Sequence, residues 1–436
     1  MRHPTPTPGR DLGIGACSKL SSGLTSVLMG LGLVIVIGCG DSGGDDQATS
    51  ADTTTESGSG SSDESAGTDT DTETETGDTG VELCPTQGVD LDSPPPELLS
   101  DMCLVRWDGD QLQYEDNVYA YDLNTVLFSD FALKGRAIYI PPGETATYVD
   151  NGVIDFPVGT VILKSFMFPA DLREPELDID LIETRALIRY PDKWKGYPYI
   201  WDHELGDAVL TVQGEVRPVD FIGPDGIERT ATYLVPQKNQ CLECHEVKDE
   251  LDETVVVPIG PRPRYLNRES SVVPDSNQLS VFADAGWLTG VPAIDQVPKA
   301  WDHRSLADTP VDQMDDATLT TAARDYLDIN CSYCHNPRGV NGISSQLFLN
   351  WDNEDEFHLG FCKKPGSAGK GGENRHFDIV PGDAEASILV YRTETLDLGS
   401  MMPLIGRSLV HEDGIGLLRA WIDGLPPDDC LQTPDP

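Results

Sequence analysis

The sequence is poor in positive charge. It contains 30 Lys and Arg against 74 Asp and Glu in 436 residues, which gives a formal net charge of −44. A nucleic-acid partner is therefore not expected, because binding phosphates needs a basic face. The acidity is unevenly placed, since no Lys or Arg lies between Lys19 and Arg106. The net charge consequently says little about the part of the chain that folds.

The sequence also lacks an apolar run long enough to cross a membrane, which takes about 20 residues. The run at 24–38, LTSVLMGLGLVIVIG, is shorter, follows basic residues and ends at Cys39. This pattern predicts an export signal over residues 1–38, with an uncleaved signal anchor as the alternative. Residues 36–39, Val-Ile-Gly-Cys, resemble the lipobox of bacterial lipoproteins, which implies a lipidated Cys39. Its acyl chains would hold the protein at a membrane surface without spanning it.

Residues 39–82 have almost no large apolar side chain and consist mainly of Asp, Glu, Ser, Thr and Gly. Such a segment repels itself and cannot bury a core. We expect a disordered, acidic tether that separates the lipid anchor from the folded region. Gly40 rather than Asp follows Cys39, which resembles outer-membrane sorting and implies the periplasmic or cell-surface face of the outer membrane.

Residues 83–236 carry the signals of β-structure. Alternating apolar residues and β-branched or aromatic residues predict strands at 136–140, 145–149, 160–168, 183–190 and 196–201. The turn sequence Gly-Pro-Asp-Gly at 223–226 predicts a hairpin between 219–222 and 227–235. Many short strands with frequent Gly and Pro indicate an antiparallel, sandwich-like β domain.

The pattern changes after residue 236. Residues 237–315 contain a cysteine pair, a Pro-rich loop and one predicted helix at 278–288. Helical spacing prevails over 316–430, with one helix running from Asp316 into Cys331 and an amphipathic helix around 415–425. We therefore expect a multidomain chain: a mainly-β domain (83–236), a linking segment (237–315) and an all-α domain (316–430).

The ten cysteines divide into groups. Cys17 falls in the export signal and Cys39 is the anchor. Four belong to a repeated motif, and four remain: Cys84, Cys103, Cys362 and Cys430. In an exported protein these four can form two disulfides with three possible pairings. Our hypothesis is Cys84–Cys103 and Cys362–Cys430.

The repeated motif is Cys-x-x-Cys-His, first at Cys241, Cys244 and His245 and again at Cys331, Cys334 and His335. A redox dithiol would lie at a helix start in a βαβ unit, which neither copy resembles. A structural zinc site could use the four thiolates. The gap between the pairs is long for such a site, and zinc leaves the two histidines without a role.

Covalent haem explains all three residues of each copy. Cysteines at i and i+3 of a helical turn share a face and can form thioethers with the two haem vinyl groups. The histidine at i+4 then lies on the same side to bind iron. We therefore predict two covalently bound haem c groups.

The sixth ligand of the second iron is sought downstream of His335. The sequence Gly399-Ser-Met-Met-Pro resembles the Met-Pro loop of class I cytochromes c, which implies Met402 as the ligand and Met401 as the alternative. Both methionines could instead pack apolar surface. His358, His376 and His411 also lie downstream.

The first iron has no such candidate, because no methionine lies between His245 and Met314. His203 and His303 are possible ligands, although each could be an ordinary loop histidine. Bis-histidine, distant methionine and five-coordinate iron all stay open for this haem.

The chain resembles a family of exported bacterial di-haem c-type cytochromes, most of them functionally uncharacterised. The resemblance covers about 98–425 and rests on separated motifs: FSDFALKGRAIYIPPG, FPVGTVILKSF, KNQCLECH, PIGPRPRYLN, YLDINCSYCHNPRG, IVPGDAEASILVYR and MMPLIGRSLVHEDG. It implies haem c on both motifs and a cytochrome c-like C-terminal domain, but no substrate.

These observations predict a lipid-anchored, exported cytochrome that transfers electrons between unidentified redox partner proteins. The alternative is a haem enzyme, peroxidase-like or a small-molecule oxidase, that uses the first haem as an open catalytic site. A third possibility is that the β domain binds a protein or glycan partner and the haem region serves it.

Overall fold

The computed structural model describes residues 86–109, 111–306, 309–340, 345–366 and 371–431. The predicted signal peptide, Cys39, the acidic tether and Cys84 lie outside this part of the chain. The described residues belong to one compact unit, Asp78–Pro436. Within it, no described helix is both long and apolar enough to span a bilayer.

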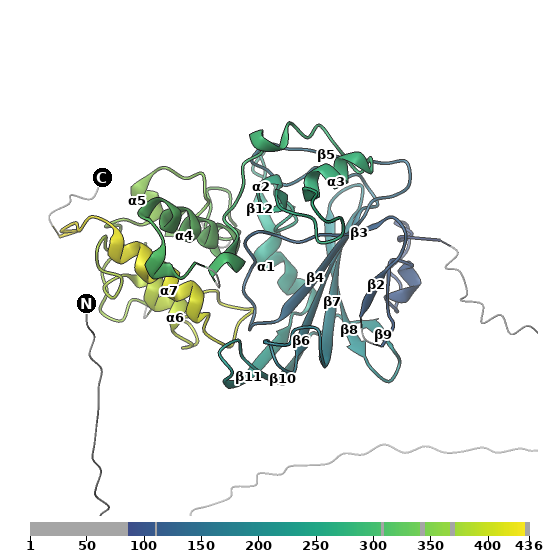
Figure 1. Ribbon diagram of the computed structural model, residues 1–436, viewed down its shortest axis with the longest axis horizontal. Helices are drawn as coiled ribbons and strands as arrows, with labels where there is room; N and C mark the ends of the chain where they lie inside the picture. Colours follow the sequence, from purple (N-terminus) through teal and green to yellow (C-terminus); the bar gives the residue numbers. More distant parts are fainter. Residues whose placement is uncertain (1–85, 110, 307–308, 341–344, 367–370, 432–436) are drawn as a thin grey trace, which may run out of the picture. The chain divides into compact units, whose positions relative to one another are not determined.

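A six-stranded antiparallel sheet organises the β-rich region (Figure 1). Its strand order is β3-β4-β6-β7-β8-β9. The strands are β3 (Val118–Ala120), β4 (Leu133–Tyr139), β6 (Val161–Pro169), β7 (Ile179–Arg189), β8 (Trp194–Asp202) and β9 (Asp207–Leu210). The predicted antiparallel β-structure is confirmed, and four of the five single strands expected from alternation lie in this sheet.

One face of the sheet carries an apolar core. Leu163, Ala186 and Tyr199 point into it and are almost fully buried. The 3₁₀ helix η1 (Ser100–Met102) and the hairpin of β1 (Val105–Trp107) and β2 (Leu112–Tyr114) contribute to the same core. The period-2 alternation of the strands places these side chains on one side.

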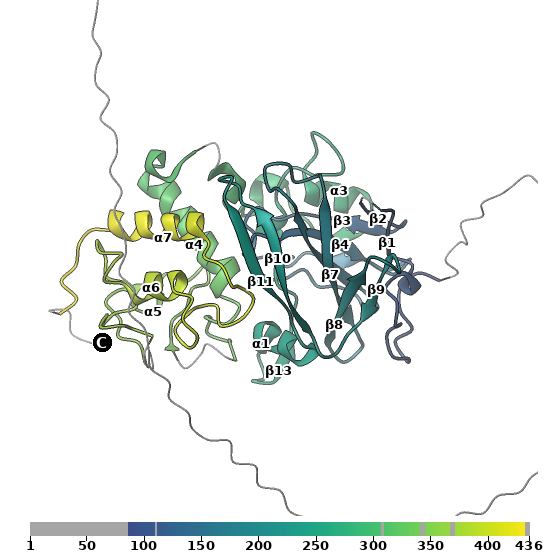
Figure 2. The ribbon, with the colours of Figure 1, turned by 90° about the horizontal axis from the view of Figure 1, so that it is seen from below.

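The opposite face is covered in sections by different elements. At one end, Ile138 and Ile162 pack with α2 (Pro263–Leu266) and α3 (Gln278–Asp284). At the other end, Phe168 packs against Phe221 and Tyr233 of the predicted hairpin, β10 (Glu215–Ile222) and β11 (Glu228–Val235). Figure 2 shows this hairpin as a separate pair of strands beside the sheet. The second layer is thus a hairpin and short helices.

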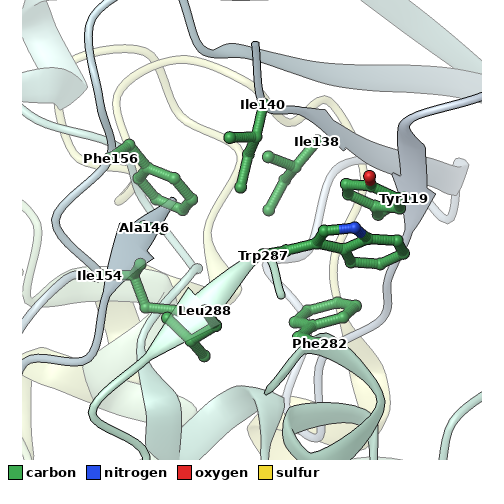
Figure 3. A pocket seen from close by; sticks show the side chains of 9 residues that line it. All are labelled: Tyr119, Ile138, Ile140, Ala146, Ile154, Phe156, Phe282, Trp287 and Leu288. Atoms are coloured by element: carbon green, nitrogen blue, oxygen red, sulfur yellow. The ribbon is translucent and has the colours of Figure 1, made fainter. Parts of the chain in front are cut away.

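The α3 end of this core encloses only a small cavity. Trp287 lies among Tyr119, Phe282 and aliphatic side chains (Figure 3), and the space left is about 20 Å³. A volume of this size holds about one water molecule, so the region is packed core rather than a ligand site.

The helix predicted at 278–288 ends earlier, at Asp284. Gly286 has a φ of +78°, a left-handed conformation that ends the helical path. Beyond it, β14 (Leu288–Thr289) pairs in parallel with β5 (Ala146–Thr147). Residue 288, the last residue of the predicted helix, therefore belongs instead to a strand that pairs with a distant segment of the chain.

Residues 309–431, where described, contain four α-helices joined by long loops. They are α4 (Asp316–Cys331), α5 (Glu356–Leu359), α6 (Ile388–Glu394) and α7 (Glu412–Gly424). The helices predicted at 316 and around 415–425 are confirmed as α4 and α7. Asp315 caps α4 by accepting a hydrogen bond from the Thr318 N–H at 2.7 Å. A Cβ at Gly414 would collide with the Tyr326 ring, so the glycine allows α7 to approach α4 closely.

Buried polar contacts connect these helices to the β-rich region. The Asp130 carboxylate, at the start of β4, accepts hydrogen bonds from the backbone N–H groups of Ser408 and Leu409 at 2.6 and 2.8 Å. Arg264 donates to Asp325 of α4 at 2.6 Å. The region that holds the second motif is therefore fixed to the sheet by charged groups.

The disulfide hypothesis is confirmed where it can be followed. Cys362 and Cys430 are bonded, which ties the residues after α5 to those after α7. Cys103 is also disulfide-bonded, while its expected partner Cys84 lies outside the described residues.

Candidate functional site

The first motif forms a single helical turn, α1 (Cys241–His245), directly after the 3₁₀ helix η2 (Lys238–Gln240). Reciprocal side-chain hydrogen bonds between Gln237 and Gln240 cap the entry. This turn places both thiols and the imidazole on one side of the helix. It packs tightly on β8, since a Cβ at Gly196 would stand 3.1 Å from the Cys241 sulfur.

The second motif begins at the last residue of α4 and continues the helical path. The His335 N–H donates to the Cys331 carbonyl at 2.9 Å, an i to i+4 bond beyond the helix end. Asn336 holds the turn by donating from its side chain to the Ser332 carbonyl at 2.7 Å. Both copies therefore have the same local arrangement of two thiols and one imidazole, as the spacing predicts.

Both histidines are oriented through their Nδ1 atoms. Nδ1 of His245 lies 2.7 Å from the Val257 carbonyl oxygen, to which it donates, and Nδ1 of His335 lies 3.2 Å from Ser345 Oγ. Burial lowers the pKa of each imidazole to about 4, so both are neutral at pH 7. A neutral imidazole held through Nδ1 presents Nε2 as a metal ligand.

The four motif cysteines are free thiols with suppressed acidity. Burial raises the pKa of Cys244 to about 11 and the pKa values of Cys331 and Cys334 to about 12. Reactive dithiols need a lowered pKa instead. Among the described residues, no three Cys, His, Asp or Glu side chains gather as a metal-binding group. The geometry therefore favours neither redox-dithiol chemistry nor a four-cysteine zinc site.

The two motifs, 90 residues apart in the chain, lie in contact. The Cys334 sulfur is 3.5 Å from the carbonyl oxygen of Glu243, inside the first motif. The chain following each motif is also paired, through a bridge between Val247 and Gly339 and a 2.7 Å bond from the Lys248 N–H to the Arg338 carbonyl. The sequence did not reveal this proximity, because it arises from tertiary pairing of two loop segments.

A cavity of about 680 Å³ lies beside the first motif. Cys241 and His245 line it, together with apolar residues such as Leu187 and Trp194 and charged residues such as Lys193 and Glu253. Cofactor sites commonly have volumes of about 300–1,000 Å³ and mainly apolar walls. The volume thus suits a prosthetic group held by Cys241 and His245, while the walls are mixed rather than mainly apolar and Cys244 is not among the lining residues.

Met402 lies in the loop between α6 and α7. Its N–H donates to the Arg392 carbonyl at 2.7 Å, and its own carbonyl accepts from Arg407 at 3.1 Å. The Arg392 guanidinium is close enough to His335 to contribute to its lowered pKa. Met402 is partly buried, and Met401 is more deeply buried at 7% exposure.

The candidate histidines have other partners. His203 pairs with Asp180 at 2.9 Å on an exposed end of the sheet, and His358 pairs with Asp355 at 2.8 Å. His376 is exposed. None of these three has an environment that points to iron ligation.

His303 and His411 belong to an aromatic cluster next to the second motif. Their rings are 5.5 Å apart, and Tyr326 of α4 shares a 3.0 Å hydrogen bond with Nδ1 of His411. Phe128 stacks on His411 at 4.3 Å. Burial lowers the pKa of His411 to about 3 and also lowers the pKa of His303. His303, considered above as a ligand for the first iron, thus contacts the second-motif helix.

Positive side chains of the sheet also border the first motif. Lys164 and Arg185 both contribute to the low pKa of His245 through their charges. They were not singled out from the sequence, although a lysine within the apolar run VILKSFMF is an unusual strand residue and could have been noticed.

No protein-family model, curated protein or solved structure matches the chain.

Proposed function

We propose that this protein is an exported di-haem c-type cytochrome that transfers electrons between redox partner proteins. The observation that carries the proposal is the contact between the two motifs, with Cys334 3.5 Å from the Glu243 carbonyl. Two prosthetic groups attached there would be neighbours. Bound haem iron would supply reversible one-electron chemistry between Fe(III) and Fe(II).

The chain's own residues would bind and orient the two groups. Cys241, Cys244 and His245 would hold the first, and Cys331, Cys334 and His335 the second. The neutral imidazoles, fixed through Val257 and Ser345, support this assignment.

For the region 316–430 we propose a cytochrome c-like all-α domain. Support comes from the close packing of α4 and α7 at Gly414 and from the Met402 loop between α6 and α7. In this domain Met402 would supply a thioether ligand to the second iron, with Met401 as the alternative. A thioether ligand raises the reduction potential of haem iron.

The proposal includes export and membrane attachment. Residues 1–38 would direct export, and lipidated Cys39 would anchor the protein on the periplasmic or cell-surface face of the outer membrane. The cysteine usage supports an oxidising location, because Cys362–Cys430 and Cys103 are disulfide-bonded.

Haem counting by pyridine haemochrome, on full-length protein made in a host that attaches haem c, tests the proposal. The Cys241→Ala/Cys244→Ala and Cys331→Ala/Cys334→Ala variants should each lose half of the haem. The matched control is Leu177→Ala/Leu205→Ala, which changes two exposed side chains without touching either motif. Absence of covalent haem in the unaltered chain would refute the proposal.

The axial assignment has a separate spectroscopic test. Met402→Ala should remove the near-infrared charge-transfer band of methionine-ligated Fe(III), and Met401→Ala should leave it. Loss of the band in Met401→Ala alone would transfer the assignment to Met401.

One observation favours a second candidate, a haem enzyme with an open first iron. Among the described histidines, His203 pairs with Asp180 and His303 contacts Tyr326 and His411, so neither is placed as its sixth ligand. A high-spin fraction that binds cyanide or reacts with peroxide would support this function. Two low-spin, six-coordinate haems would support the electron carrier.

A further inference from the structure

Four cations gather on the sheet face that carries the first motif. We name them the sheet cations: Lys134 and Arg136 of β4, Lys164 of β6 and Arg185 of β7. Arg136 pairs directly with Lys164 across the strands, and Lys164 pairs directly with Arg185. Like charges directly opposite each other destabilise a sheet, so this row needs compensation.

The acidic side chains nearby are already engaged. Glu183, fully buried, accepts two bonds from Arg185 at 2.9 and 2.5 Å and another from Tyr233 at 2.7 Å. Asp122 accepts from Arg136, and additionally from Arg268 and Arg304 at 2.9 Å each. Neither carboxylate can also neutralise the lysines.

The two lysines are left without an ion pair among the described residues. Lys134 donates to the Ala132 carbonyl at 2.7 Å and interacts electrostatically with Asp130, and its ammonium lies 5.9 Å from the centre of the Phe166 ring. Lys164 makes no hydrogen bond or ion pair to a described residue, and its ammonium rests 5.0 Å from the centre of the Phe166 ring. Both lysines are partly buried, so each ammonium has lost part of its hydration without forming an ion pair with a carboxylate.

This surplus of positive charge stands out in an acidic chain. Residues 86–436 alone hold 60 Asp and Glu against 27 Lys and Arg, so an unneutralised group of cations is not a consequence of composition. It also has a defined place. Arg185 lies two residues from Leu187 on β7, and Gly196, the partner of Leu187 on β8, faces the Cys241 sulfur of the first motif, which would stand 3.1 Å from a Cβ at that position.

We propose that the sheet cations bind an anionic group of the carboxylate type beside the first motif. The group has two possible sources with the same chemistry: a propionate of an attached haem, or a free small carboxylate that reaches the site. The first source rests on the proposed function, and the second does not. Charge-assisted hydrogen bonds from ammonium and guanidinium groups would stabilise the anion in either case.

The experiment uses the full-length protein and its Lys164→Met variant, with formate as the probe. The matched control is Lys299→Met, which removes one positive charge from an exposed side chain that does not line the cavity beside the first motif. Lys164→Arg keeps the charge and should behave as the unaltered protein, which separates loss of charge from a failure to fold.

If the anion is a free carboxylate, formate should raise the thermal midpoint of the unaltered protein, and the rise should saturate with formate concentration. Lys164→Met should lose this response and Lys299→Met should keep it. If the anion is a haem propionate, formate should leave the thermal midpoint unchanged. Lys164→Met should then lower the reduction potential of one haem by at least 59 mV, which is a tenfold change in its one-electron equilibrium. The fall is expected because a nearby cation stabilises Fe(II).

The inference is overturned if Lys164→Met alters neither the formate response nor any haem potential relative to Lys299→Met. It can fail independently of the proposed function. A chain without covalent haem would refute the cytochrome, while the formate measurement would still decide whether the sheet cations bind an anion.

Discussion

The buried ion pair between Arg264 and Asp325 gives a quantitative test of how α4 is fixed to the rest of the protein. The two side chains are only 6% and 1% exposed, and their nitrogen and oxygen atoms are 2.6 Å apart. The second carboxylate oxygen of Asp325 accepts from the Trp301 N–H, also at 2.6 Å. Removing the guanidinium would leave a buried carboxylate with one backbone donor.

Arg264→Met keeps the length of the side chain but removes its charge. Breaking a buried pair in this way costs about 3–5 kcal/mol, because the remaining charge has no compensation. The matched control is Arg106→Met. Its 2.9 Å pair with Glu115 is 57% and 37% exposed, and surface pairs contribute only about 0–1 kcal/mol. Denaturant unfolding, followed by circular dichroism, measures both free energies.

The pH dependence of Arg264→Met distinguishes charge from packing. Burial already raises the pKa of Asp325, and Arg264 opposes that rise. Without Arg264 the folded-state pKa rises further above the unfolded value of about 3.9. Stability is then highest below the unfolded pKa and is lost as pH increases through the folded pKa. The penalty of Arg264→Met should therefore shrink on acidification and in the double variant with Asp325→Asn. A penalty that is constant with pH and additive in the double variant would refute the electrostatic explanation.

Further predictions concern the disulfide and a buried histidine. Replacing Cys362 and Cys430 by Ala should lower the free energy of unfolding by about 4 kcal/mol, since the bond closes a span of 68 residues; calorimetry that finds no loss would contradict this. The pKa of His411 is lowered to about 3, so its unfolded form binds a proton as pH falls below about 6.5, and stability decreases toward acid. His411→Phe retains an aromatic ring against Phe128. It should reduce the loss of unfolding free energy on acidification by about 1.4 kcal/mol per pH unit between pH 6 and 4. Parallel curves of unfolding free energy against pH for the two proteins would contradict the assignment.

The sequence predicted those parts of the fold that depend on local periodicity. Alternation located β4, β6, β7 and β8, and the Gly-Pro-Asp-Gly turn located the β10–β11 hairpin. The cap at Asp315 and the apolar spacing after Ile415 identified α4 and α7. Short elements such as β12 (Glu246–Lys248) and β13 (Thr254–Val256) were not predicted, because two or three residues are too few to show the alternation of a strand. The strand at 288–289 depends on its distant partner β5, so the helical pattern that precedes it was misleading.

Of the candidate site, the sequence predicted the residues but not their surroundings. The i, i+3, i+4 spacing correctly placed the thiols and imidazole of each motif on one helical turn. The acceptor of His245, a backbone carbonyl at Val257, has no side-chain signature and could not be read from the sequence. The contact between Cys334 and Glu243 and the proximity of Lys164 depend on tertiary packing across many residues. Such contacts can be predicted only once the sheet and its crossing segments are placed.

The surroundings of the first motif have a consequence for the order of events during synthesis. His245 is bordered by residues of β6 and β7, which precede it by 60 to 80 positions, and its motif contacts Cys334, which follows 90 positions later. Contacts at such separations form late, because chain closure must precede them. The chain is synthesised from its N-terminus, so Cys241 and Cys244 cannot contact Cys334 until the residues beyond 334 have been made. This interval leaves both thiols accessible to covalent modification before the second motif packs against the first.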